Sequence, residues 1–528
     1  MKFIQGQDRN QAFLFPVSLD QSVGPDNEVR LIDIFADSLP LDDFGFTMDY
    51  IENGRPAYHP AVLLKLFIYG YLNKIRSSRD LEKECKRNLE LMWLLQCLQP
   101  DHNTIANFRR DNPKAIKKVF RATVQIAKHF EMIGGRLIAG DSTKLRAQNS
   151  KKNNFNQKKI ESHIAYIDNR LEEYSNALAE QDGDNKRLIQ EEITKQLQRK
   201  EQYLALQNRL EETNEAQIST SDPESRQMII RNNITEVAYN VQTTVDSKHC
   251  LPIDYKVTNN NDSKAMGNMV QRAKSILGTN NFTALYDKGY HTGSELKTAQ
   301  LLGVETIVAI PDIPSSSFAP DANYNVSEFR YNPVDDSYTC PQGNTLTTNG
   351  NWYKKDRRNS SVMVQHYKTK ACRNCPVLNQ CTKNTRGRGR VIERTEHAAY
   401  IEQNRKNIEK NEHFYKRRQA IVEHPYGTIK RQWGYNYILT KKGKERASAD
   451  VGFMFIAYNL RRIINIIGQK RLREYLKGLL FSAFHPWQTI RGDIGPFFHL
   501  LKECRKNLLN LKYLFNLNVY PKDLLKFI

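Results

Sequence analysis

Three acidic residues are the strongest candidates for chemistry in this sequence. Asp141 follows the apolar run LIA, and Asp287 follows the segment FTALY, so each is expected to close a strand. In an open α/β sheet, the carboxyl ends of neighbouring strands meet at one edge of the sheet. Two carboxylates there repel each other unless cations neutralise them, and a pair of Mg²⁺ ions about 3.5–4 Å apart is the usual arrangement for phosphodiester chemistry. Glu423, in the basic segment YKRRQAIVEHPYGTIKRQWG, is the candidate third carboxylate.

Basic residues surround Glu423. Residues 381–446 hold 17 Lys and Arg against 7 Asp and Glu, a net charge of +10 and nearly half of the excess of the whole chain. This density predicts a salt-dependent affinity for the nucleic-acid backbone. In a helix, Lys430 would follow Glu423 by two turns on roughly the same face, and Arg418 would precede it by about one turn, so both are candidates to hold a phosphate. The alternative for each of these acidic or basic side chains is a solvated charge or a helix cap.

Four cysteines in a loop-rich segment are candidate ligands of a structural Zn²⁺ ion: Cys340, Cys372, Cys375 and Cys381. They form one CxxC pair with two outlying thiols, and four thiolates suit tetrahedral zinc. The segment is polar with few apolar residues, so a metal would stabilise it. His366 is a rival ligand. The remaining cysteines, Cys85, Cys97, Cys250 and Cys504, are expected to be buried thiols, because eight cysteines in a chain of this size do not make a disulfide framework.

The composition favours a soluble, multidomain protein with a polyanionic partner. The chain has 528 residues, which predicts about three or four domains. It carries 79 Lys and Arg against 58 Asp and Glu, a net charge of +21 that favours nucleic acid as the partner. The longest apolar run, VGFMFIAYNL, has ten residues, fewer than the roughly 18 of a membrane helix. The N-terminal MKFIQGQDRN lacks a signal-peptide core, so we expect a cytoplasmic protein without a membrane partner.

The first 130 or so residues are predicted to be helical. Apolar residues recur at helical spacing from residue 59 to residue 75, and Ser77 or Ser78 would cap the following helix. Asn103 would cap TIANFRRDN, a short helix expected to turn Phe108 inward and Arg109 and Arg110 outward. Short helices that end in a basic one indicate a helix-turn-helix-like DNA-binding module. An ordinary helical bundle with a solvated basic face is the alternative.

A mixed α/β pattern follows, interrupted by a helical hairpin. The strand RLIAGDSTKL is followed by a long polar stretch in which apolar residues are spaced 4-3-4-3-4, a heptad seam: Ile160, Ile164, Ile167, Leu171, Tyr174 and Leu178. A weaker second helix follows the turn QDGD, with an apolar set of Ile189, Ile193, Leu197, Leu204 and Leu210. Two strands, a helix, a strand, a helix and a buried strand then follow, which indicates an α/β domain with an inserted antiparallel helical hairpin.

Several of these segments together resemble the DDE transposases of bacterial insertion sequences. The segments are GDSTKLRAQNSKKN, EVAYNVQTTVDSKH, YDKGY, VEHPYGTIKR and FIAYNLRR. The Glu segment also resembles the family signature Y-x2-R-x3-E-x6-K, which Tyr415, Arg418, Glu423 and Lys430 match with one departure. Four residues, not three, separate Arg418 from Glu423, and Gln419 occupies the position of the signature Arg. The segments YHPAVLLKLFIYGYL and RSSRDLEKECKRN are similar to the helical N-terminal domain of one group of these transposases.

The resemblance implies a ribonuclease-H-like core in which Asp141, Asp287 and Glu423 hold two Mg²⁺ or Mn²⁺ ions. One ion would activate water or a DNA 3′-hydroxyl and the other would stabilise the leaving oxygen. The implied reaction is cleavage at the ends of an element followed by strand transfer into target DNA, carried out by a homodimer on double-stranded DNA in the bacterial nucleoid. The predicted DNA contacts are Tyr415, Arg418, Lys430, Lys288, Arg109 and Arg110.

The predicted fold class is therefore α/β, with a ribonuclease-H-like core and three additions. The predicted domains are a helical DNA-binding domain over residues 1–132, the first part of the core over 133–312 with the hairpin at 152–218, a small zinc-ribbon-like insertion over 313–395, the second part of the core over 396–470, and a basic helical tail over 471–528. The alternatives are a metal-dependent nuclease without strand transfer, a catalytically silent DNA-binding protein of transposon origin, and an RNA-processing enzyme.

Overall fold

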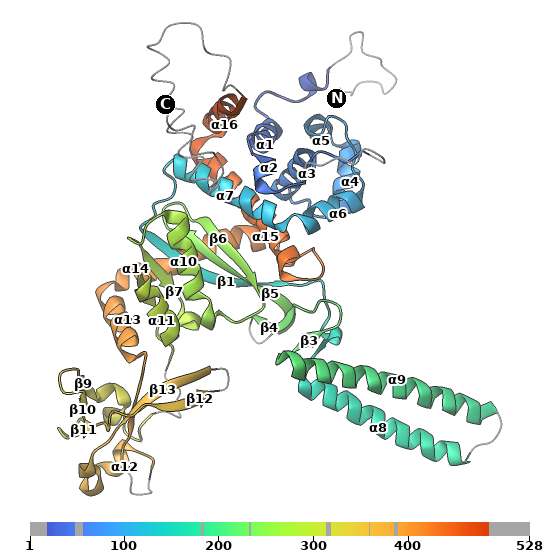
Figure 1. Cartoon of the computed structure of the whole chain (residues 1–528). Helices are drawn as coiled ribbons and strands as arrows, with labels where there is room; N and C mark the ends of the chain where they lie inside the picture. The colour runs from blue at the N-terminus through green and yellow to red at the C-terminus, as the bar shows by residue number, and fades with distance from the viewer. Residues whose placement is uncertain are drawn as a thin grey trace, which may run out of the picture. The chain divides into compact units, whose positions relative to one another are not determined.

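The computed structural model describes residues 18–47, 56–180, 184–231, 234–312, 318–357, 360–384 and 389–484. The chain divides into two compact units. The first comprises Met1–Gly134, Ser142–Asn260 and Ile421–Ile528, and the second comprises Gly135–Asp141 and Asn261–Ala420. The protein is mixed α/β with a helical N-terminal region, as predicted (Figure 1).

The N-terminal region of the first unit is built from short helices. They are α1 (Glu28–Asp37), α2 (Leu41–Phe44), α3 (Pro60–Leu72), α4 (Ser78–Arg87), α5 (Leu89–Leu94), α6 (His102–Asp111) and α7 (Pro113–His129). Ser77 caps α4 as predicted, since its hydroxyl accepts a hydrogen bond from the backbone N–H of Asp80. The prediction that Asn103 caps TIANFRRDN is wrong: the cap of α6 is Asp101, whose carboxylate accepts from the N–H groups of Asn103 and Thr104.

A long apolar helix near the C-terminus completes the core of this region. Helix α15 (Lys444–Ile467) buries most of its residues and packs against α3, α6 and α7, and also against strand β6 (Leu251–Thr258). Phe453 stacks on Phe67 of α3 at a ring distance of 4.8 Å. The segment that the sequence shows as its longest apolar run is therefore a core helix that ties the N-terminal helices to the sheet.

The strands of the first unit pair in an antiparallel meander. β4 (Arg226–Arg231) pairs with β5 (Ile234–Asp246), which pairs with β6. β5 is buried from Val237 to Asp246, and in the sheet it lies beside β1 (Leu137–Arg146) as well as β4 and β6. Both strands predicted from ITEVAYNVQTTVD and LPIDYKVTNN are confirmed.

The second unit contains three parallel strands covered by helices. β1 (Leu137–Arg146) pairs with β7 (Thr283–Tyr286), and β7 pairs with β8 (Glu305–Val308). β1 is shared, since the chain passes from the second unit into the first at residue 142. Helices α10 (Met266–Leu277), α11 (Gly293–Leu301) and α13 (Ala398–Lys410) accompany these strands. The side chain of Asn404 on α13 pairs with the backbone N–H and C=O of Val308, and so occupies β8 hydrogen-bonding groups that would otherwise be open.

The predicted helical hairpin is confirmed. α8 (Gln157–Glu180) and α9 (Asp184–Thr213) pack along each other, and two short strands, β2 (Asn154–Phe155) and β3 (Ile218–Ser219), pair at their base (Figure 1). Ile160 and Ile167 of the heptad seam are buried. The predicted apolar face of α9 is partly wrong, because Leu197 and Leu204 are 47% and 42% exposed. The buried side of α9 carries polar Gln196 instead.

The cysteine-rich region contains more regular structure than its sequence suggested. β9 (Arg330–Asn332), β10 (Ser337–Thr339) and β11 (Thr345–Thr347) form one antiparallel sheet, and β12 (Tyr353–Arg357), β13 (Ser360–Tyr367) and β14 (Ile392–Thr395) form another. The expectation of a thin apolar core is wrong. Tyr324, Phe329, Tyr338, Leu346 and Tyr367 are buried together, and these aromatic residues are hidden in the sequence among polar neighbours.

The chain then returns to helices. α14 (Glu412–Tyr426) continues into a π-helical turn over Gly427–Gln432, and α15 and α16 (Gln469–Phe484) follow. The rest of the predicted basic tail, and Cys504 within it, lies outside the described residues. Within the ranges given above, no single helix is long and apolar enough to cross a membrane. α15 and α16 pass that test only as a pair bent by 113°, and α15 is mostly buried in the protein.

Candidate active site

The two predicted metal-binding aspartates lie at the same level of neighbouring parallel strands. β1 and β7 pair with Leu137 opposite Thr283 and Ala139 opposite Leu285. Counting two residues further along each strand reaches Asp141 and Asp287. Asp287 directly follows β7, as predicted, whereas the prediction that Asp141 closes its strand is wrong, because β1 continues to Arg146. The carboxylates are therefore brought together by strand register rather than by two strand ends.

A close approach between the two strands depends on glycine. A Cβ atom added at Gly140 would lie 2.0 Å from the ring of Tyr286. Only glycine at this position lets the aromatic ring pack against β1. Gly140 and Tyr286 directly precede Asp141 and Asp287, so this contact sets the spacing of the segments that carry the two carboxylates.

Arg418 of α14 faces the aspartates. Its Nη1 atom lies 3.3 Å from Oδ2 of Asp141, and both side chains are mostly buried, with 16% and 22% exposure. Burial alone lowers the pKa of Arg418, but the carboxylate of Asp141, with further contributions from Tyr415 and Asp287, raises it above its usual value. A side-chain hydrogen bond also joins Arg418 to Tyr415. Despite the extra residue in the signature, it is thus Arg418 that lies beside the aspartates.

The loop after Asp287 is held by short-range contacts. Oδ1 of Asp287 accepts a hydrogen bond from the N–H of Gly289 at 2.9 Å and caps a single 3₁₀ turn. Tyr290 is buried and packs on Tyr286 at a ring distance of 4.8 Å. The ammonium of Lys288 pairs with Asp312 at 2.9 Å, and both side chains are exposed. An exposed pair of this kind contributes little to stability, so Lys288 remains available to other anions.

Glu423 lies on α14 with Arg418, in the part of that helix that belongs to the first unit, and its side chain is exposed. An interval of five residues turns the helix by about 140° between them, whereas the signature interval of four would turn it by about 40°. Pro425 lies inside α14, and the π-helical turn begins two residues later. The prediction that Lys430 follows Glu423 by two α-helical turns is therefore wrong, because a π-helical turn changes the angle between successive side chains.

Lys430 is half-buried in the first unit beside other cations. Its Nζ atom donates to the hydroxyl of Thr143 at 2.9 Å. Burial lowers the pKa of Lys430, and the positive charges of Lys144 and Arg431 lower it further. Like charges gathered this closely favour a bound anion. Sequence analysis did not single out Thr143 or Lys144, although both follow Asp141 within three residues on the same strand.

One predicted DNA contact is corrected by the N-terminal helices. Phe108 is buried as predicted, but the prediction that Arg109 faces outward is wrong. The guanidinium of Arg109 is 5% exposed and donates to the hydroxyl of Tyr71 at 2.9 Å and to the backbone carbonyl of Arg76 at 3.1 Å. It thus belongs to a buried polar cluster. Arg110 is 43% exposed and pairs with the neighbouring Asp111, so it keeps the outward position that was predicted.

The four candidate zinc ligands line one small pocket of about 20 Å³: Cys340, Cys372, Cys375 and Cys381. Burial raises the pKa of Cys381. Arg390 opposes this shift, and the three other cysteines add to it. His366, the rival ligand, does not line this pocket and stacks instead on Tyr353. The donor set of four thiols fits a single zinc ion.

The candidate metal ligands, all within the described residues, are not already arranged as a metal site. In the described ranges, no group of three or more His, Cys, Asp or Glu side chains has the arrangement of a metal site. The four thiols nevertheless share one pocket, and two carboxylates lie in register on β1 and β7. Side chains move onto a metal when it binds, so the shared pocket and the strand register leave both sets of residues as candidate ligands.

Two stretches of the chain match known protein families. Residues 17–111 match the family described as "Transposase domain (DUF772)", and residues 339–464 match the family described as "Transposase DDE domain". Both matches are to transposase domains, and they are consistent with a DDE transposase of the insertion-sequence type. The DDE match covers the cysteines, Tyr415, Arg418, Glu423 and Lys430, whereas Asp141 and Asp287 lie outside both matched stretches.

Other comparisons add little to this transposase assignment. A search of curated proteins finds no significant match. Among solved structures, the chain is similar to a piggyBac transposase in a synaptic complex with hairpin DNA, determined by cryo-EM. The identity is 9%, the match covers 94% of this chain and 85% of that chain, and the TM-score is 0.26. A likeness at this level carries no argument about the fold or the reaction. DDE transposases in general use divalent metal ions.

Proposed function

We propose that this transposase cleaves DNA at the ends of its element and transfers the freed 3′-hydroxyl ends to target DNA. The observation that carries the proposal is the register of β1 and β7, which aligns Asp141 with Asp287 beside Arg418. Two carboxylates on adjacent parallel strands support a ribonuclease-H-like core. The alternatives, a nuclease without strand transfer and a silent DNA-binding relic, share these residues and are separated by the reaction products.

In this proposal, Asp141, Asp287 and Glu423 bind the divalent metal ions. Bound Mg²⁺ or Mn²⁺ would supply Lewis-acid activation of water or a 3′-hydroxyl and stabilisation of the leaving oxygen. Arg418 offsets the charge of the aspartates before DNA arrives, and its guanidinium is suited to bidentate contact with a phosphate. Tyr415 orients Arg418 through their hydrogen bond.

Three basic residues are proposed to contact the DNA backbone: Lys430, Lys288 and Arg110. Lys430 lies in the cation cluster of the first unit, and an arriving phosphate would relieve the repulsion there. Lys288 and Arg110 are exposed and paired only with exposed carboxylates, which a phosphate would replace at little cost. Arg109 is not proposed as a contact, because it is buried. We also propose that the protein acts as a homodimer bound to the two DNA ends.

Zinc is proposed to hold the cysteine-rich region. The four thiols around one pocket are the proposed ligands, and the ion would link the loop at Cys340 to the turns that carry the other three cysteines. The region has an aromatic core of its own beside the pocket. Zinc would therefore add stability to a region that already has a core.

The decisive experiment is a cleavage and joining assay with Mg²⁺ or Mn²⁺ on DNA that carries the ends of the source element. Wild type is compared with Asp287→Asn and with the control Asp312→Asn, whose side chain is 90% exposed. We expect joined products from wild type and the control. Asp287→Asn should retain DNA binding and lose at least about 100-fold in rate, since metal stabilisation of charge contributes several kcal/mol.

Each other result has a definite meaning. Cleavage without joining would favour a nuclease without strand transfer. Tight DNA binding without cleaved or joined products would favour a catalytically silent DNA-binding protein. Preference for RNA over duplex DNA would favour RNA processing. Wild-type rates in Asp141→Asn, Asp287→Asn or Glu423→Gln would contradict the assignment of that residue.

A further inference from the structure

A rigid polar frame lies at the base of the helical hairpin, within the first unit. It is the segment from Ser219 to Ser225, and it bonds to two other segments of the chain. On one side, the amide nitrogen of Asn149 donates to the hydroxyls of Ser219 and Ser225 at 2.6 and 2.8 Å. The N–H of Thr220 donates to the carbonyl of Asn153 at 3.0 Å. The segment 149–153 is therefore fixed to the frame at both of its ends.

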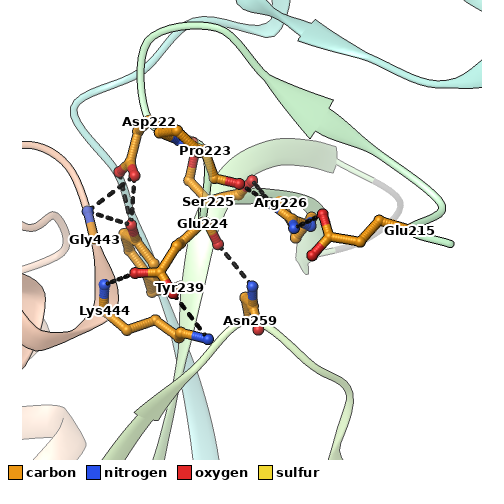
Figure 2. Close-up of polar contacts among 10 residues, drawn as sticks. All are labelled: Glu215, Asp222, Pro223, Glu224, Ser225, Arg226, Tyr239, Asn259, Gly443 and Lys444. Carbon is orange, nitrogen blue, oxygen red and sulfur yellow. Dashed lines mark hydrogen bonds and ion pairs between the residues drawn. The ribbon is translucent and has the colours of Figure 1, made fainter. Parts of the chain in front are cut away.

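On the other side, the frame holds the start of α15. Asp222, only 2% exposed, accepts hydrogen bonds from the hydroxyl of Tyr239 at 2.7–2.8 Å and from the N–H of Gly443 at 3.0 Å. Glu224 accepts from the N–H of Lys444 at 2.8 Å and pairs with its ammonium at 3.0 Å. Figure 2 shows both carboxylates turned toward this turn of the chain. Burial and the Asp222 carboxylate raise the pKa of Tyr239, so its hydroxyl stays a donor.

These contacts occupy part of the anion-binding capacity of the helix N-terminus. The first N–H groups at an α-helix start and the positive end of its dipole attract anions. Here Asp222 and Glu224 already satisfy the N–H groups of Gly443 and Lys444. An external anion at this place therefore finds fewer free N–H groups and depends more on side chains.

Each segment that bonds to the frame carries a pair of exposed lysines. Lys151 and Lys152 lie in a 3₁₀ turn on one side, and Lys441 and Lys442 directly precede Gly443 on the other. In the described part of the chain, the side chains of Lys152, Lys441 and Lys442 have no ion-pair partner, and Lys151 has only a distant one, Glu236 at 3.9 Å. The acids of the frame are committed to backbone N–H groups and to Lys444, so they leave these ammonium groups unneutralised.

We propose that the two lysine pairs, Lys151–Lys152 and Lys441–Lys442, form a binding surface for the phosphates of duplex DNA. The frame holds both segments in place, so little chain entropy is lost when phosphates bind. The surface lies outside the metal-binding residues and would bind DNA away from the reacting bond. The assignment to DNA rests on the proposed function, since the charges alone would also suit RNA.

The test is the salt dependence of binding to a mixed-sequence DNA duplex, measured by fluorescence anisotropy. Each neutralised phosphate contributes about 0.9 to the slope of log K against log salt. We expect the slope to fall by about 1.8 in Lys441→Gln/Lys442→Gln, and by as much in Lys151→Gln/Lys152→Gln. The control is Lys368→Gln/Lys370→Gln in the cysteine-rich region, outside the basic stretch 381–446, which removes the same charge from two exposed lysines without ion pairs among the described residues. Its slope should equal that of wild type.

A second measurement needs no variant. Acetylation of wild-type protein with and without DNA, read by mass spectrometry, should show protection of all four lysines but not of Lys368 or Lys370. An unchanged slope in either double variant, with wild-type circular dichroism, or the absence of protection would overturn this surface while leaving the transposase proposal intact. Tighter binding of a duplex RNA competitor would overturn the assignment to DNA. A wild-type protein without any salt-dependent DNA binding would contradict the proposed function itself.

Discussion

The Nη1 atom of Arg418 lies 3.3 Å from the Oδ2 atom of Asp141, although the two residues are 277 positions apart in the chain. The pair brings the signature helix to the strand that carries the first acidic residue. It also means that a cation already faces the carboxylates before any metal binds. Metal affinity at the proposed site would therefore depend partly on Arg418, and the consequence can be measured without DNA.

Arg418→Gln is expected to tighten binding of Mn²⁺ to the protein. Loss of one positive charge a few ångströms from the carboxylates removes repulsion of about 1 kcal/mol after solvent screening, or about five- to tenfold in Kd. Isothermal titration with Mn²⁺ gives the constant directly. Arg417→Gln is the matched control, because this neighbouring side chain is exposed and has no ion pair among the described residues. Equal or weaker Mn²⁺ binding by Arg418→Gln would contradict the role assigned to the guanidinium.

Lys430→Met is expected to raise thermal stability and weaken DNA binding. The pKa of Lys430 is lowered by burial and by Lys144 and Arg431, so the charged form is disfavoured in the folded protein. Below the folded pKa the charge costs stability, and this cost disappears as the pH rises toward the usual value of 10.5. At neutral pH we expect Tm to rise by about 1–2 °C and the salt slope of DNA binding to fall by about 1.

Differential scanning fluorimetry and anisotropy test both effects of Lys430→Met. The gap in Tm between wild type and variant should narrow as the pH approaches 10.5, since both proteins then lack the charge. A variant that is less stable at neutral pH, or that binds DNA with the wild-type salt slope, would show that Lys430 has a packing role alone.

Asp450→Asn is expected to destabilise the first unit by about 3–5 kcal/mol, because it leaves a buried cationic cluster without its counter-ion. Asp450 is fully buried on α15 and pairs with Arg76 at 2.9 Å and, more distantly, with Arg109 at 3.7 Å. Its other partners are the hydroxyl of Tyr71 and the N–H of Leu439. Urea unfolding followed by circular dichroism should show a lower midpoint.

The stability that Asp450 and its arginine partners contribute should depend on pH. Burial raises the pKa of Asp450, but the two arginines and the hydrogen bonds from Tyr71 and Leu439 together lower it by more, so the folded pKa lies below the usual 3.8. The stabilisation is complete above that pH and is lost as the pH falls through the folded pKa. The difference between wild type and Asp450→Asn should therefore shrink in acid. Asp111→Asn, an exposed control, should cost less than about 1 kcal/mol, and an equal cost for both would argue against the buried cluster.

Purified wild-type protein is expected to contain one zinc ion per chain. Replacement of both residues of the CxxC pair, Cys372→Ser/Cys375→Ser, should remove it and lower the unfolding temperature, because two of four ligands are lost. Atomic absorption on metal-free buffers measures the content. Cys97→Ser is the control, since this thiol lies apart from the pocket and is exposed, so the expectation that it is buried is wrong. A wild-type protein without zinc after growth in zinc-supplemented medium would contradict the proposed site.

Local pattern was enough to predict much of the fold. The alternation in β5, the heptad seam of α8 and the apolar run before Asp287 depend on neighbours in sequence, and the corresponding elements are present. Burial faces were harder to predict. The buried side of α9 includes Gln196 while Leu197 faces outward, because the partner helix, not the apolar residues alone, decides which side is covered.

The sequence by itself determined which residue types are available for chemistry: the acidic residues, the signature helix, the cysteines and the excess of positive charge. Tertiary structure decided their partners. Arg109 looks like a surface cation in TIANFRRDN, and only Tyr71 and Arg76, more than thirty residues away, make it a buried one. Strand register aligned Asp141 with Asp287, and helix packing brought Arg418 to Asp141. Local spacing cannot encode such pairs, because a charge is neutralised by whichever opposite charge the folded chain places beside it.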